Sequence, residues 1–387
     1  MPLVLKHNFD AVTQFGIIIN NQNGFGRLGH EVLPEQCPFF GCFVGASADY
    51  STPDNSVVRV WQEALYYHFN SGITSSNRGK EALVATRVNL VVLASGSTGN
   101  AIAITGPGGW FLIDLGLQVA DLRRRMAISE LNPAECRGCL LTHTHGDHWR
   151  DSSLGWLASR QIPLWLHAAH LADLRRQSRA VHTLEAATAV RLFQPNTTFS
   201  PISGVEVLPA EISHDSHPTF GFRIIVRDLQ DSRSNEARIG YFSDLGQWNK
   251  SHNHLLEDLH LLALEFNHHI PLLDVSPRPD FLKRRISGPK GHLSNQQAGQ
   301  VVSSIKSAPK GQTLVLLHLS KECNTQEHAL SEAKSASNAN GKIEKIEVAL
   351  QNEPLPPIPL KTISGTAMIQ TDDDFGPLFQ SLRSRAL

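Results

Sequence analysis

Apolar positions from residue 88 onward fall into short runs that are separated by polar or glycine-containing turns. Such runs, bounded by turn signals, predict buried strands. The predicted strands are residues 88–93, 101–105, 110–114, 139–142, 163–166, 205–208, 220–226, 239–242, 261–264 and 313–317. Helical periodicity at residues 119–126, 295–305 and 326–336 separates some of them. This mixture predicts an α/β fold in which helices cover layered sheets.

The two ends of the chain differ from this regular middle. Residues 1–85 hold short apolar pieces between polar stretches, and only residues 57–69 have a helical pattern. Because long structureless segments are uncommon inside compact domains, residues 1–85 are interpreted as an accessory N-terminal segment. The main domain is predicted to span residues 86–350. Proline-rich residues 354–359 predict a stiff break, so residues 351–387 are assigned to this break and a C-terminal tail.

Composition excludes several classes of protein. Hydrophobic residues make up 41% and charged residues 18% of the 387 positions, as in ordinary folded domains, and no apolar run is long enough to span a bilayer. The N-terminal residues do not match a secretory signal. Five cysteines, an odd number, fit a reducing compartment better than a disulfide framework, which predicts a cytoplasmic protein. A net charge of −1 argues against a protein that coats nucleic acid with its whole surface, but allows local basic patches.

Two cysteines have the spacing of half a zinc site. Cys136 and Cys139 would need Cys37 and Cys42 as the other half. The alternative is a pair of structural thiols, which we favour because Cys139 opens an apolar strand, where a buried thiol needs no further role.

The 19 histidines of the chain are clustered. His143 and His145 follow a predicted strand, and side chains two residues apart in an extended chain point the same way, so both can bind one ion. Asp147 and His148 come next at a turn, where they can face a second ion. Imidazoles and carboxylates at this spacing suit zinc or another borderline divalent metal.

These four residues resemble the H-x-H-x-D-H signature of the metallo-β-lactamase superfamily. That family has a later histidine, an aspartate and a last histidine, each after a strand, and His214, Asp244 and His318 match them. The resemblance implies a metallo-β-lactamase αββα sandwich with two metal ions. The implied ligands are His143, His145 and His214 for one ion, Asp147, His148 and His318 for the other, and Asp244 as a bridge. Asp114 matches a family aspartate that supports the ligands from behind.

Three further stretches resemble the YycJ (WalJ) group within that superfamily. They are residues 93–100, 264–269 and 291–295, the last of them preceded by the basic segment 282–286. This group consists of predicted exonucleases and phosphodiesterases. The resemblance therefore implies a dinuclear hydrolase that cleaves DNA or RNA by attack of a metal-bound hydroxide. Zinc is the expected metal, with manganese as the alternative.

Several side chains are candidates for roles in this chemistry. Asp147 is expected to hold the attacking water and accept its proton, because a carboxylate beside metal ions stays ionised at neutral pH. His268 either protonates the leaving oxygen or is a structural histidine at a strand end. His292 is assigned to both catalysis and substrate binding. With Lys283 and Arg285 it lies in a cationic stretch that would meet phosphate oxygens, the alternative being a solvated surface.

A glycine-containing loop adds three more candidates. Ser95, Ser97 and Asn100 lie where backbone amides either hold an anion of the substrate or simply make a turn.

Two other functions compete with a nuclease. A lactonase or thioesterase on the same fold would attack a carbonyl and would need an apolar substrate pocket. A metal-stabilised scaffold would recruit a protein partner through residues 1–85, but degenerate family members usually lack ligands, and none is missing from this set. Residues 1–85 are alternatively a lid over the site. The sequence leaves the oligomeric state open.

Overall fold

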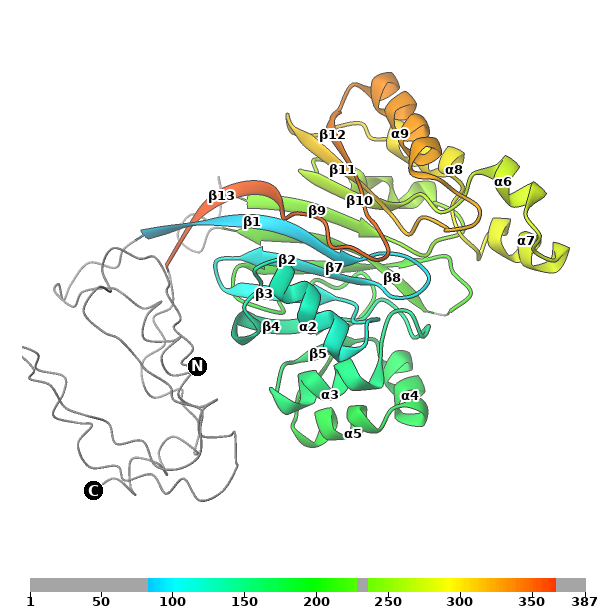
Figure 1. The fold of residues 1–387 in the computed structure, drawn as a ribbon. Coiled ribbons are helices and arrows are strands. Elements are labelled where there is room, and N and C mark those ends of the chain that lie inside the picture. The colour runs from blue at the N-terminus through cyan, green and yellow to red at the C-terminus, as the bar shows by residue number, and fades with distance from the viewer. Residues whose placement is uncertain (1–82, 217, 228–235, 367–387) are drawn as a thin grey trace, which may run out of the picture. The chain divides into compact units, whose positions relative to one another are not determined.

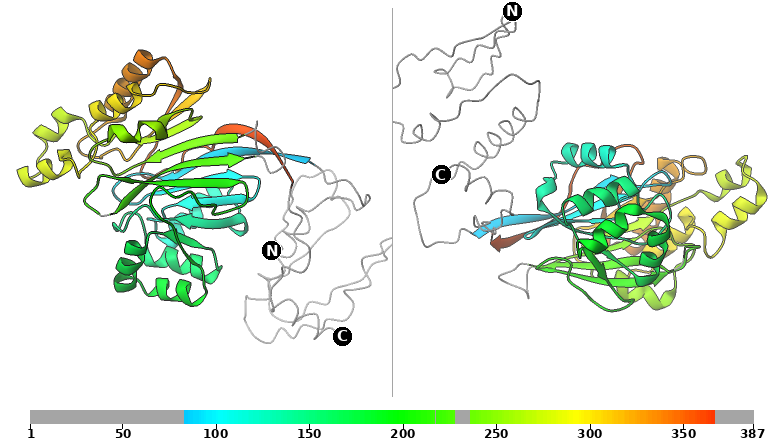
Figure 2. Two further views of the ribbon diagram at one scale, coloured as in Figure 1. Left: turned by 180° about the vertical axis from the view of Figure 1, so that it is seen from behind. Right: turned by 90° about the horizontal axis from the view of Figure 1, so that it is seen from below.

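Two β-sheets pack face to face, and helices lie on the outer side of each (Figures 1 and 2). The computed structural model describes residues 83–216, 218–227 and 236–366. The predictions for residues 1–82, which include the helix at 57–69 and the thiols of Cys37 and Cys42, lie outside this part of the chain. The αββα sandwich expected from the sequence is confirmed.

The first sheet, within the described residues, has the strand order β13-β1-β2-β3-β4-β5-β6. Its strands are β1 (Leu83–Ala94), β2 (Ala101–Gly106), β3 (Gly109–Ile113), β4 (Cys136–Leu140), β5 (Leu164–Leu166), β6 (Val190–Leu192) and β13 (Ile358–Thr366). Pairing is antiparallel from β13 to β3 and parallel from β3 to β6. Parallel neighbours require crossover connections, which the helices of the first half supply.

The second sheet has the order β12-β11-β10-β9-β8-β7. Its strands are β7 (Val205–Ile212), β8 (Thr219–Arg227), β9 (Glu236–Phe242), β10 (Leu261–Glu265), β11 (Gln312–Leu317) and β12 (Ile343–Val348). Strands β9 to β12 are parallel to one another. Their carboxyl ends therefore meet along one edge of the sheet.

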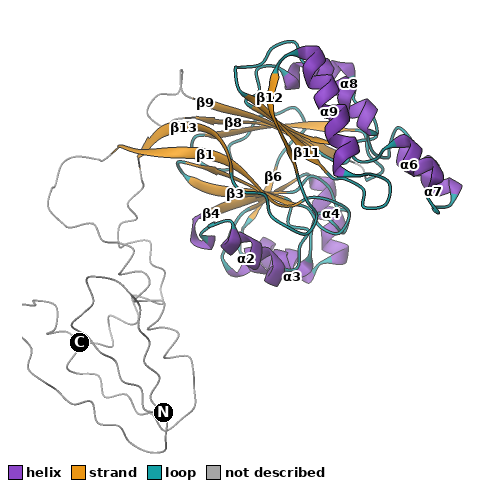
Figure 3. Ribbon diagram, turned by 45° about the horizontal axis from the view of Figure 1, so that its top comes forward, coloured by secondary structure: helices purple, strands orange, loops and turns teal. Residues whose placement is uncertain are grey.

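Four helices pack on the first sheet, α2 (Val119–Ile128), α3 (Asp151–Ser159), α4 (Ala168–Gln177) and α5 (Arg179–Ala186). On the side of the second sheet lie α6 (Ile270–Val275), α7 (Asp280–Ser287), α8 (Asn295–Ser303) and α9 (Gln326–Asn340) (Figure 3). Short 3-10 helices occur at Pro133–Glu135 and Lys250–Leu256. A capping box between Ser294 and Gln297 starts α8, and Gly341, with a φ of 64°, ends α9.

Alternation along the strands divides the hydrophobic core into three layers. On β1, Leu90 and Val92 face the second sheet, whereas Val91 and Leu93 face the helices of the first half. A third layer lies between the second sheet and α8 and α9. Both sheets are therefore buried on both faces, which explains why their strands appear as continuous apolar runs.

The C-terminal boundary expected from the sequence needs correction. Residues 358–366, assigned there to a tail, form β13, which pairs with β1. Pro359 lies in this edge strand, where a missing backbone N–H is tolerated. The segment before it is also held, since the buried guanidinium of Arg125 donates to Gln351 O at 3.0 Å. A proline-rich stretch thus marked an edge strand instead of the end of the fold.

Among the described residues, no helix has the length and apolar character needed to cross a bilayer.

Candidate metal centre

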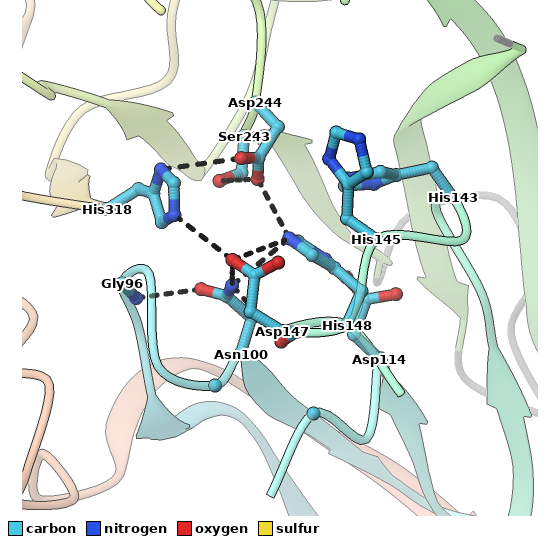
Figure 4. Close-up of polar contacts among 12 residues, drawn as sticks. Gly96, Asn100, Asp114, His143, His145, Asp147, His148, Ser243, Asp244 and His318 are labelled. Carbon is cyan, nitrogen blue, oxygen red and sulfur yellow. Dashed lines mark hydrogen bonds and ion pairs between the residues drawn. The ribbon is translucent and has the colours of Figure 1, made fainter. Parts of the chain in front are cut away.

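The loops that follow the strands bring the predicted ligands together at one edge of the sandwich (Figure 4). Within the described residues, three overlapping groups can each hold a metal ion. They are His143, His145 and His214; His143, His148 and Asp244; and Asp244, Glu265, His292 and His318. All seven predicted ligands except Asp147 belong to these groups, and Asp147 lies beside two of them. The structure places the predicted ligand set at one site.

Three residues of the site have a left-handed backbone one or two residues after the end of a strand. The φ angles are 61° for Asp114, 57° for Asp244 and 55° for His318. This conformation is uncommon for residues other than glycine and is retained only where surrounding structure holds it in place. Each turn redirects a side chain from the end of its strand into the site.

Gly116 lets two of these loops approach closely. A Cβ atom at this position would lie 1.8 Å from the backbone oxygen of Asp147. That oxygen accepts from Asn100 N at 2.8 Å, and Gly116 N donates to Asn100 O at 2.8 Å. The loop of residues 143–148 is thus fixed by backbone hydrogen bonds to loops far away in the sequence.

Asp114 lies against the ring of His148. Its carboxylate lies 2.7 Å from His148 Nδ1 and accepts from the backbone N and Oγ1 of Thr142. A carboxylate on one imidazole nitrogen fixes the ring so that the other nitrogen faces the metal position. His148 Nε2 lies 3.2 Å from Asp244 Oδ2 and 3.7 Å from Asp147 Oδ2.

The first metal position is surrounded by three imidazoles. His214 Nδ1 lies 3.0 Å from Gly291 O, which leaves Nε2 free to face His145 Nδ1 at 3.3 Å. His143 Nε2 is buried and has no hydrogen-bond partner in the described part of the chain. Unpaired buried nitrogens are rare in proteins. A divalent ion that accepts the lone pairs of His143, His145 and His214 accounts for this arrangement.

The second metal position shows the same signature. His318 Nδ1 lies 3.0 Å from Glu265 Oε2, and the buried Nε2 of His318 lacks a hydrogen-bond partner among the described residues. This Nε2 lies 3.7 Å from Asp147 Oδ2. Unpaired nitrogens at both positions mean that the residues present fit two bound ions. The donor set does not by itself distinguish zinc from manganese.

Without metal, these groups perturb one another strongly. Burial lowers the pKa of His143 well below its usual value, and the neighbouring His148 lowers it further. Burial opposes the charge of His148 as well, but the carboxylates of Asp114 and Asp244 outweigh it and raise the pKa of that ring. Metal binding requires neutral imidazoles, so ion uptake will release protons.

Glu265 was missed in the sequence, although it is central to the site. Its buried carboxylate accepts from the backbone N of Asp244 at 3.0 Å and of Leu293 at 2.8 Å. It also lies 3.0 Å from Nδ1 of both His292 and His318. Burial opposes ionisation, but His292 and His318 outweigh it and lower the pKa of Glu265 to about 2. A carboxylate with these partners positions His292 and His318. The sequence signal that could have identified Glu265 is a charged residue at the end of the otherwise apolar strand β10.

His292 lies at the rim of this cluster. Its side chain is 22% exposed, and its Nδ1 lies 3.8 Å from Asp244 Oδ1. Burial opposes protonation, but the Glu265 carboxylate outweighs it and raises the pKa of His292. His292 is thus a partly exposed imidazole beside the candidate ligands whose protonated form Glu265 favours.

The surroundings of His268 favour one of its two expected roles. It is only 1% exposed, and burial lowers its pKa to about 4. The ring is therefore neutral at pH 7, which favours the structural alternative.

The glycine-containing loop supports the site instead of opening toward a substrate. Ser95 is 3% exposed, and its hydroxyl accepts from the backbone N of His318 at 2.8 Å. Asn100 is 2% exposed, accepts from Gly96 N and lies 3.1 Å from His148 Nε2. These internal contacts favour the alternative in which Ser95 and Asn100 shape the turn instead of binding substrate. Ser97 is exposed at the tip of the loop.

The cationic candidates lie on α7. Arg285 pairs with Asp215, whose Oδ2 lies 2.6 Å from Arg285 Nε and whose Oδ1 lies 3.5 Å from His145 Nε2. Lys283 Nζ donates to the backbone oxygen of Asp274 at 2.6 Å. Arg285 therefore borders the metal centre, whereas the contact of Lys283 holds α7 against the end of α6.

Cys136 and Cys139 are both buried and are free thiols. Burial raises the pKa of Cys136 to about 12, and that of Cys139 well above its usual value. Protonated thiols are poor metal ligands, which agrees with structural roles.

Comparison with known proteins assigns the family. A family model described as a beta-lactamase superfamily domain matches residues 109–319. The chain belongs to the beta-lactamase superfamily. The matched segment runs from β3 past His318 and includes every candidate ligand. Together with the histidine and aspartate groups, this membership supports the expected enzyme class, a metal-dependent hydrolase.

Individual members of the superfamily are more distant. The exodeoxyribonuclease YycJ of Bacillus anthracis is 25% identical over 240 residues, which cover 62% of this chain and 84% of that protein. The exodeoxyribonuclease WalJ of Streptococcus pneumoniae matches with the same identity and coverage. The predicted likeness to this group is confirmed. A long form RNase Z from yeast has a TM-score of 0.51 at 13% identity, covers 80% of this chain and 45% of that chain, and shares the fold.

Proposed function

We propose that the protein is a phosphodiesterase that cleaves nucleic acid at a centre of two divalent metal ions. The observation that carries this proposal is the convergence of two buried imidazole nitrogens without hydrogen-bond partners among the described residues, His143 Nε2 and His318 Nε2, near the carboxylates of Asp147 and Asp244. Two ions held there would supply a water of lowered pKa and neutralise charge on the phosphate. The resemblance to exodeoxyribonucleases favours a nucleic acid as the substrate.

Asp147 is the residue that we assign to the attacking water. Its side chain is 21% exposed, and its Oδ2 lies between the Nε2 atoms of His148 and His318, at 3.7 Å from each. Asn100 Nδ2 lies 3.4 Å from the same oxygen and restrains it. The carboxylate can hold a water and accept its proton. Asp147→Asn is expected to keep the fold and lose turnover.

His292 is the residue that we assign to the leaving oxygen. Glu265 holds Nδ1 at 3.0 Å, so the opposite nitrogen is available to donate a proton to the departing group. This assignment replaces His268.

A lactonase or thioesterase is less well supported. The partly exposed side chains at the rim of the metal centre, Asp215, Arg285 and His292, are all polar or charged. An acyl chain would need an apolar slot instead. The second alternative, a protein partner that binds residues 1–85, stays a prediction outside the described part of the chain.

We also propose that the protein acts in the cytoplasm. Its described cysteines, Cys136, Cys139 and Cys323, are all free thiols, which fits a reducing compartment.

The proposal is tested with end-labelled single- and double-stranded DNA and RNA in the presence of zinc or manganese. Wild-type protein is compared with His145→Ala, and bis(p-nitrophenyl) phosphate is included as a small phosphodiester. Metal-dependent cleavage that is lost in the variant supports the proposal. If a metal-loaded wild type hydrolyses lactones or thioesters but no phosphodiester, the proposal fails.

A further inference from the structure

The helix α7 presents an exposed aromatic side chain together with two cations. Phe281 is 68% exposed, which is unusual for so large an apolar group. Arg284 and Arg285 follow three and four residues later, so all three side chains share one face of the helix. Figures 1 and 3 show α6 and α7 extending beyond the second sheet, away from α8 and α9.

The surroundings of this face are positively charged. Residues 270–290 contain five cationic and two acidic side chains, in a chain whose net charge is −1. Arg284 is exposed and forms no ion pair with the described part of the chain. Arg285 is 62% exposed, so its pair with Asp215 is open to solvent. Arg284 is therefore available to an anionic partner, and Arg285 can exchange its exposed pair with Asp215 for a contact with the same partner.

The same face leads to the metal centre. Arg285 contacts Asp215, which contacts His145, as described above. The segment after α7 packs directly against the site, since Pro289 O accepts from Ser213 Oγ at 2.8 Å. Phe281 lies four residues before Arg285, a helical rise of about 6 Å. A ligand bound along this helix face therefore lies next to the residues that contact the metal centre.

An exposed aromatic ring beside cations matches the chemistry of single-stranded nucleic acid. Unpaired bases stack on aromatic rings, and backbone phosphates bind arginine. Bases in a duplex are already stacked and cannot use Phe281.

From this juxtaposition we infer that Phe281, Arg284 and Arg285 form a binding surface for single-stranded nucleic acid at the edge of the metal centre. Phe281 stacks on a base, and the two arginines bind neighbouring phosphates. The inference rests on the proposed function and adds a strand preference to it: the enzyme holds one unpaired strand and feeds it to the centre.

The test measures binding separately from cleavage. Fluorescence anisotropy of labelled oligothymidylate, oligouridylate and a DNA duplex is recorded with metal-free protein in EDTA. Variants are Phe281→Ala, Phe281→Trp and Arg284→Ala. The matched controls are Ile128→Ala, which removes an apolar side chain that is 56% exposed on α2, and Arg123→Ala, an exposed arginine of the same helix.

Phe281→Ala is expected to raise the Kd for the single strand about 5- to 100-fold, which is the effect of losing one base–aromatic stack. Phe281→Trp keeps an aromatic ring and should retain binding. Arg284→Ala should reduce the salt dependence of binding by about one ion. Ile128→Ala and Arg123→Ala should bind as wild type. The DNA and RNA strands show whether the sugar matters.

Two results would overturn the inference. One is a Phe281→Ala variant that binds single strands as tightly as Ile128→Ala, which would leave Phe281 to contact a protein partner. The other is tighter binding of wild type to the duplex. Both leave the proposed function intact, because hydrolysis of bis(p-nitrophenyl) phosphate by the metal-loaded wild type is measured independently. Absence of that hydrolysis, with oligonucleotide binding retained, would instead count against the proposed function alone.

Discussion

The two sides of the metal centre are built from similar groups in different environments. On the inner side, Asp114, Thr142 and His148 are at most 1% exposed and hydrogen-bond to one another. On the outer side, the side chains of Asp215 and Arg285 are 25% and 62% exposed. Breaking a buried charge pair costs about 3–5 kcal/mol, whereas an exposed pair contributes about 0–1 kcal/mol. The inner side can therefore fix the positions of the candidate ligands. On the outer side, Arg285 can exchange Asp215 for a substrate.

The largest effect is expected where the inner loops touch. In Gly116→Ala, the new Cβ would overlap the backbone oxygen of Asp147, and nothing flexible is there to move. A shift of the motif loop by about 1 Å should lower kcat about 100-fold. Turnover and metal content are measured beside Gly146→Ala, whose Cβ would meet no atom within 4 Å. Equal turnover in the two variants would show that the inner side tolerates displacement.

A somewhat smaller effect is expected from the carboxylate behind His148. Asp114→Asn keeps the size of the side chain but weakens the interaction with Nδ1 of that ring. Metal affinity should fall about 10- to 100-fold. Competition with a chromogenic chelator measures it, and Asp121→Asn, on the exposed side of α2, is the control. Unchanged affinity would mean that packing alone orients His148.

The contrast between buried and exposed groups extends to histidines outside the centre. His170 is buried, its Nε2 lies 2.8 Å from Pro218 O, and burial lowers its pKa to about 4. The unfolded chain, with a pKa near 6.5, takes up the proton first, so the stability contribution is complete above pH 6.5 and falls as pH drops toward 4. Because of this residue, the free energy of unfolding of the wild type should be about 2 kcal/mol lower at pH 5 than above pH 6.5.

His170→Gln should remove that part of the pH dependence, because an amide can still donate to Pro218 O without titrating. Urea unfolding of the metal-free protein at pH 7 and pH 5 measures the difference. The exposed His182→Gln serves as the control, and the same pH dependence in both variants would contradict the assignment.

The smallest effect on folding is expected on the outer side. Arg285→Ala removes an exposed pair and should change the free energy of unfolding by less than about 1 kcal/mol. Thermal unfolding in low and high salt measures this change. A loss of several kcal/mol would show that the Asp215–Arg285 pair is part of the structural framework and would erase the contrast between the two sides.

The sequence alone determined the sandwich and the set of candidate ligands. Apolar runs predicted strands because a strand that is buried on both faces is apolar at successive positions, and this pattern can be recognised from residues that are near one another in the chain. The motif from His143 to His148 was recognisable for the same reason: its spacing is local. The later positions His214, Asp244 and His318 were found through the resemblance to the superfamily, whose later ligands each follow a strand.

Only the tertiary structure decided which polar side chains serve the ligands. Glu265 reaches His292 and His318, and Ser95 reaches the backbone of His318, across long separations in sequence. No local pattern reports such contacts, so Ser95 appeared to be available to a substrate, and Glu265 was given no role although it lies in the stretch 264–269. The burial of a side chain also results from contacts between segments that are far apart in the sequence. Whether a histidine such as His268 is enclosed depends on elements that pack over it from elsewhere in the chain.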